Sequence, residues 1–113
     1  MNTQIKNAVI ESTSIDTGRG GMVTIWLHLK YNSGSQGFGG HALYLAKDYT
    51  NHSIDCGFAG HFIYRCMEIA GVEKWEQMKG KTIRVKATDS GVEEIGHIIK
   101  EDWFNPLKDF KTK

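Results

Sequence analysis

An aromatic, an imidazole and a cationic side chain recur at every second position near the start of the chain. Trp26, His28 and Lys30 lie in a stretch in which apolar and polar residues alternate. Alternate residues of a β-strand point to one face of a sheet, so these three side chains would share a surface. Aromatic rings stack on nucleic acid bases, and cations beside them attract phosphates. The trio therefore predicts a site for single-stranded nucleic acid or a nucleotide.

Two further cations, Arg84 and Lys86, alternate with apolar residues in a later stretch. If the sheet brings the two stretches together, these side chains extend the candidate surface. The alternative is structural: long cationic side chains keep exposed strands from aggregating, and the aromatic C-terminal segment could cover Trp26.

A glycine-rich run supplies the other candidate ligand-binding residues, Gly39, Gly40 and His41. Exposed amides in such a run can cradle a phosphate. The run nevertheless lacks the Lys-Ser/Thr pair of a Walker loop and precedes a strand instead of a helix. Glycines in a strand also mark a bulge or a close approach, here with Phe38 packed beneath a neighbouring strand or helix. Both interpretations stay open.

The remaining chemistry-bearing residues form no catalytic or metal-binding motif. The histidines lack HExxH spacing, no serine lies in a GxSxG turn, and the two cysteines lack zinc-site spacing. His28 and His41 could share a site across a hairpin, although ordinary cross-strand neighbours on a solvated face are the favoured explanation. We expect no catalytic residue, metal or cofactor, and reduced thiols at Cys56 and Cys66. A binding protein is therefore favoured over an enzyme.

The elements that would position these residues are three strands, one helix and two strands. Period-two alternation is clearest over residues 22–31, and spacings of three and four predict a helix over 57–71 that ends at Gly71. The other expected elements are strands over 5–14, 36–46, 82–88 and 92–100 and a short turn over 73–78. The aromatic segment 103–113 is expected to pack back onto the core.

This order predicts the α+β class, as a five-stranded antiparallel sheet or an OB-like, partly open barrel with one main helix. A chain of 113 residues fits a single domain, 1–113. The net charge of +1 provides no general attraction for duplex DNA or an acidic membrane. With no apolar run long enough for a signal peptide or a membrane span, we expect a cytoplasmic protein with no membrane partner.

Three runs carry a resemblance: QGFGGHAL at 36–43, GVEKWEQMKGKTIRVKA at 71–87 and IGHIIKEDWFNPLKDF at 95–110. Together they resemble small uncharacterised accessory proteins of tailed bacteriophages and prophages of Gram-negative bacteria. This resemblance implies a gene product that acts in the cytoplasm of an infected bacterium. It brings no catalytic residues with it.

The sequence thus favours a non-enzymatic accessory protein that occupies a host protein or sequesters a nucleotide, as an anti-defence factor would. The alternative is a single-stranded nucleic-acid-binding module of phage replication or recombination, working through Trp26, His28, Lys30, Arg84 and Lys86. The aromatic C-terminal segment adds homo-oligomerisation as an open alternative.

Overall fold

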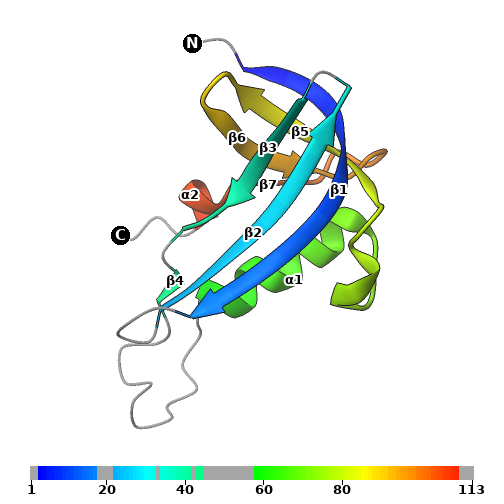
Figure 1. The fold of residues 1–113 in the computed structure, drawn as a ribbon. Coiled ribbons are helices and arrows are strands. Elements are labelled where there is room, and N and C mark those ends of the chain that lie inside the picture. The colour runs from blue at the N-terminus through cyan, green and yellow to red at the C-terminus, as the bar shows by residue number, and fades with distance from the viewer. Residues whose placement is uncertain (1–2, 18–21, 33, 42, 45–57, 110–113) are drawn as a thin grey trace, which may run out of the picture.

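The computed structural model describes residues 3–17, 22–32, 34–41, 43–44 and 58–109. These residues form one curled sheet and one main helix, so the α+β class is confirmed (Figure 1). The strands are β1 (Gln4–Thr17), β2 (Met22–Tyr31), β3 (Gly34–Gly39), β4 (Leu43–Tyr44), β5 (Thr82–Thr88), β6 (Gly91–Gly96) and β7 (Trp103–Phe104). The helices are α1 (Phe58–Ala70), a 3-10 turn η2 (Trp75–Gln77) and α2 (Pro106–Asp109).

The sheet is antiparallel and runs in the order β3-β2-β1-β5-β6-β7, with β4 paired to β2. It curls until β3 lies against β6, which is not its hydrogen-bonded neighbour. Beside this contact, the Gln36 side chain of β3 donates to the carbonyl of Thr88, the last residue of β5, at 3.0 Å. The sheet is therefore an OB-like half-barrel.

The prediction of five strands was two short. The expected third strand, 36–46, is divided: β3 ends at Gly39, and β4 begins at Leu43. The expected last strand, 92–100, ends at Gly96, because the amide of His97 donates to the carbonyl of Asp102 at 3.0 Å and the chain turns back into β7. Both added strands have only two residues, too few for a periodic pattern.

Strand β1 is long because it serves two partners. Residues 4–9 pair with β5 and residues 9–17 pair with β2, with a register shift between Ile10 and Ser12. At this bulge, Ile10 exchanges backbone hydrogen bonds with Gly80 and Lys81 at 2.7 and 2.8 Å. A bulge bends a strand, and here it turns β1 from one wall of the half-barrel into the other.

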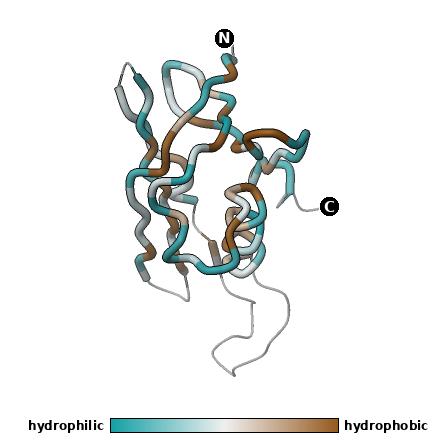
Figure 2. Tube along the Cα trace, turned by 90° about the vertical axis from the view of Figure 1, so that its right-hand side faces the viewer, coloured by the Kyte–Doolittle hydropathy of each residue, from teal (hydrophilic) through white to brown (hydrophobic). Residues whose placement is uncertain are grey.

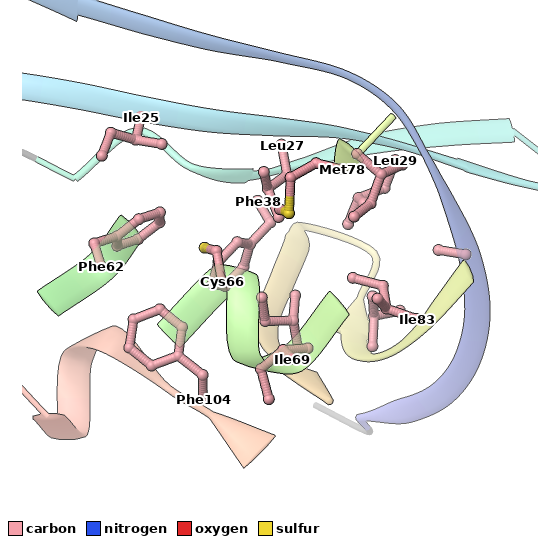
Figure 3. Packing of buried hydrophobic residues seen from close by; sticks show 14 of the residues in the cluster. Ile25, Leu27, Leu29, Phe38, Phe62, Cys66, Ile69, Met78, Ile83 and Phe104 are labelled. Carbon is pink, nitrogen blue, oxygen red and sulfur yellow. The ribbon is translucent and has the colours of Figure 1, made fainter. Parts of the chain in front are cut away.

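Helix α1 fills the concave side of the sheet. Its Phe62, Cys66 and Ile69 are fully buried. Figure 3 shows these side chains between those of β2 and the ring of Phe104 on β7. Each such buried side chain contributes roughly 1.5–3 kcal/mol to folding. The helix ends as predicted: Gly71 has a left-handed φ of 71°, and the amide of Val72 donates to the carbonyl of Met67 at 3.1 Å.

The C-terminal segment packs onto the core through Phe104, whose ring centroid lies 5.3 Å from that of Phe62. Arg65 on α1 holds this segment with bonds of 2.9 Å to the carboxylate of Asp102 and to the carbonyl of Trp103. The bond from Arg65 lowers the pKa of Asp102. Phe110 lies outside the described residues.

Hydrophobic and hydrophilic residues are mixed along the strands, which lie against the helix (Figure 2). In the part of the chain that is described, no helix has the length and apolar character needed to cross a membrane. Cys66 is a free, buried thiol whose pKa is raised by burial, and Cys56 lies outside the described residues.

Candidate nucleic-acid interface

Strand β2 divides its side chains between the core and solvent as its alternation predicts. Ile25, Leu27 and Leu29 are fully buried, whereas Trp26, His28 and Lys30 face outward. On one side, the outward residues pair with Ser14, Ser12 and Val9 of β1. On the other side, they pair with Gly39, Gly37 and Ser35 of β3. Most of these neighbours are small, so the three large side chains dominate this outer face, which we call the Trp26 face.

The indole of Trp26 lies over β3, where glycines leave room for it. A Cβ at Gly37 would come within 2.8 Å of ring atom Cζ3, and a Cβ at Gly40 would overlap ring atom Cζ2. The His28 ring is nearly parallel, with an interplanar angle of 15° and a centroid distance of 6.4 Å. Trp26 remains 37% exposed. The two rings therefore present aromatic surface to solvent, as base stacking requires.

The glycine run serves this arrangement in a second way. Gly39 has a φ of 117°, and a Cβ there would overlap the carbonyl oxygen of Ile25. The same carbonyl accepts a hydrogen bond from the amide of Gly40 at 2.9 Å. The expected close approach is thus present, with Phe38 buried beneath and stacked on Phe62 at 5.6 Å. Because the Gly40 amide is used within the sheet, it is not available to a phosphate.

Lys30 is exposed at the end of the Trp26 face. No carboxylate of the described residues forms an ion pair with it. A phosphate that binds such an ammonium group does not have to displace a carboxylate from it. Lys30 therefore suits an anionic ligand.

Arg84 and Lys86 lie on the outer side of β5, with β1 between them and β2. Arg84 donates to the carbonyls of His97 and Lys100 at 2.8 and 2.7 Å and to Glu101 at 3.0 Å. The ammonium of Lys86 lies 3.6 Å from the carboxylate of Glu94. These two cations therefore belong to a separate, internally paired group.

That group is centred on Trp103, whose ring covers Gly96 of β6. A Cβ at Gly96 would come within 2.5 Å of the ring. The Arg84 and Lys86 groups lie 4.8 and 4.4 Å from the Trp103 ring centroid, within cation–π range. The indole nitrogen also donates to Glu101 at 3.2 Å, and this bond, with that from Arg84, lowers the pKa of Glu101.

His28 and His41 are not brought together. His28 is stacked with Trp26 on the outer face, whereas His41 packs against the buried ring of Phe62 at a centroid distance of 6.2 Å. Burial lowers the pKa of His41, and no described residue bonds its buried Nδ1. Within the described ranges, no three histidine, cysteine or acidic side chains are grouped to hold a metal ion.

Sequence reasoning missed a pocket of about 320 Å³ beside Lys30. It opens where β1 and β2 separate. Val9 and Lys30 form the β1–β2 pair nearest the N-terminus, and the residues of β1 before Val9 pair with β5 alone. Asn7, Asn32 and Thr82 line it together with Lys30. No sequence signal marks the pocket, because it exists only where β1 changes its pairing partner from β5 to β2.

The chain matches no protein-family model, and comparisons with curated proteins and with solved structures found no similar protein. The resemblance to phage accessory proteins therefore stays a prediction, as does cytoplasmic location.

Proposed function

We propose that this protein is a non-enzymatic binding protein whose ligand is single-stranded nucleic acid, held on the Trp26 face. Its main support is the indole of Trp26, which lies on glycines and remains exposed beside the parallel ring of His28. Stacking on such a surface accepts any base, since every base has a π-face. Lys30, which forms no ion pair with a described residue, adds an attraction for the phosphates.

The half-barrel favours the same ligand class. Oligonucleotides and oligosaccharides bind OB-folds at the face of the second and third strands. The Trp26 face lies on β2 and β3 of this OB-like sheet. A cation beside the rings favours the anionic ligand of the two.

Fluorescence anisotropy with a labelled single strand of about eight nucleotides tests this function. Replacing Trp26→Ala should weaken binding by roughly 10- to 100-fold, the loss of one stacked base. Trp103→Phe, which keeps an aromatic ring beside Arg84 and Lys86, is the matched control and should bind as the wild type does. Equal binding by Trp26→Ala and wild type, or equal affinity for duplex, would contradict the proposal.

The sequence also predicts a factor that sequesters a nucleotide or occupies a host protein. This stays a prediction, and separate measurements test it. A mononucleotide that binds as tightly as the longer strand would favour nucleotide sequestration. Recovery of one bacterial protein in stoichiometric complex, with no strand bound, would favour the host-protein form. The near-neutral charge of +1 supports neither a long phosphate track nor duplex binding.

A further inference from the structure

The pocket beside Lys30 adjoins the Trp26 face and has a composition suited to one nucleotide. Its volume of about 320 Å³ lies at the lower end of the range for small-ligand pockets. Ala8 and Tyr31 are buried lining residues, and Val9 is partly exposed. A nucleobase, which has an aromatic face and a polar edge, fits a pocket that combines buried lining residues with exposed polar ones.

The rim provides groups that can read a base edge. Asn7 and Asn32 each carry a donor and an acceptor, and Thr82 carries a hydroxyl that does both. All three are exposed. Among the described residues, no side chain bonds to theirs. Asparagine amides pair with base edges in nucleic acid complexes.

A second pocket of about 260 Å³ shares Lys30, Tyr31 and Asn32 with the first pocket but extends toward β3 instead of β5, and it serves as a comparison. Glu11 lines only this second pocket, and a carboxylate there would repel a phosphate. The first pocket has no acidic lining residue. The charge around Lys30 therefore favours the side of Asn7 and Thr82 for an anionic ligand.

We propose that the pocket lined by Asn7, Asn32 and Thr82 is a second nucleotide subsite. It would hold one base of the strand whose neighbouring part stacks on Trp26, with Lys30 meeting the phosphates between the two. This inference rests on the proposed function and adds the path of the bound strand across the sheet. The strand follows β2 from Trp26 past Lys30 and ends at the point where β1 and β2 separate.

The test is a length series of labelled single strands, from a dinucleotide to about eight nucleotides, measured by anisotropy. The wild type should gain affinity once a strand spans both subsites. The double variant Asn7→Ala/Asn32→Ala should lose about tenfold on the longer strands only, as expected for lost hydrogen bonds. Ser90→Ala, an exposed residue in the turn between β5 and β6, is the control and should behave as the wild type.

Each result is decisive. A wild-type affinity that does not rise beyond the dinucleotide would overturn the second subsite and leave the proposed function intact. So would a double variant that matches the wild type at every length. If no strand of any length binds, the proposed function itself fails, and the subsite fails with it.

Discussion

Two tryptophans lie over glycines on the outer side of one sheet, and their surroundings differ in nearly every other respect. Trp103 covers Gly96 and is enclosed by Arg84, Lys86 and Glu101. Trp26 covers Gly37 of β3 and Gly40 just after it, and among the described residues no cation lies over its ring. An indole packed over glycine therefore holds a segment in place at Trp103, where charged neighbours surround it. At Trp26 the same packing leaves part of the ring exposed to solvent.

The difference follows from the place of each tryptophan in the sheet. Trp103 lies on a two-residue edge strand that a few backbone bonds could not hold alone, so side-chain interactions fix it. Trp26 lies in the middle of β2, which is paired on both sides. Its position is secured without its side chain, which leaves that side chain free for a ligand.

The largest predicted effect concerns stability. Trp103→Ala should lower the free energy of unfolding by about 3 kcal/mol, since it removes packing and two cation–π contacts. Trp26→Ala should lower it by less, about 1–2 kcal/mol, because Trp26 is 37% exposed and loses no cation–π contact with a described residue. Urea unfolding of both variants measures the contrast. Equal losses would mean that Trp26 is as structural as Trp103.

The glycines beneath the two rings give a matched pair of smaller effects. Gly96→Ala should cost about 2 kcal/mol of unfolding free energy, because the enclosed Trp103 ring has little room to move. Gly37→Ala should cost about 1 kcal/mol or less, since the exposed Trp26 ring can tilt outward. Thermal unfolding of the two variants compares them. A larger cost at Gly37 would show that the Trp26 ring is held in place.

The smallest predicted effect separates Lys30, for which the described part of the chain offers no ion pair, from the paired cations. Lys30→Ala should reduce the slope of log affinity against log salt concentration by about 0.7, the value for one phosphate contact on a single strand. Lys86→Ala should leave that slope unchanged, because Lys86 already faces Glu94 and Trp103. Titrations at several salt concentrations give both slopes. A change at Lys86 and none at Lys30 would move the interface to β5.

Local patterns in the sequence predicted the region around Trp26. Alternation along β2 placed Trp26, His28 and Lys30 on one outward face, and the glycine run indicated a close approach next to it. Both inferences depend on neighbours in the chain or in the adjoining strand. They needed no knowledge of the wider topology.

The surroundings of Trp103 and the pocket beside Lys30 depended on long-range contacts. Arg84 and Lys86 looked like free cations because Trp103, which they meet, comes 17 residues or more later in the chain. The pocket at Asn7 and Thr82 likewise arises only because β1 changes partner at its bulge. Neither feature leaves a periodic signal in the sequence.

The most direct test of the central claim is an NMR titration that follows the indole N–H signals of the tryptophans as a single-stranded oligonucleotide is added. If the Trp26 face binds the strand, the Trp26 signal shifts in a saturable way and the Trp103 signal stays in place. A saturable shift at Trp103 with none at Trp26 would contradict the account and assign binding to the opposite region of the sheet.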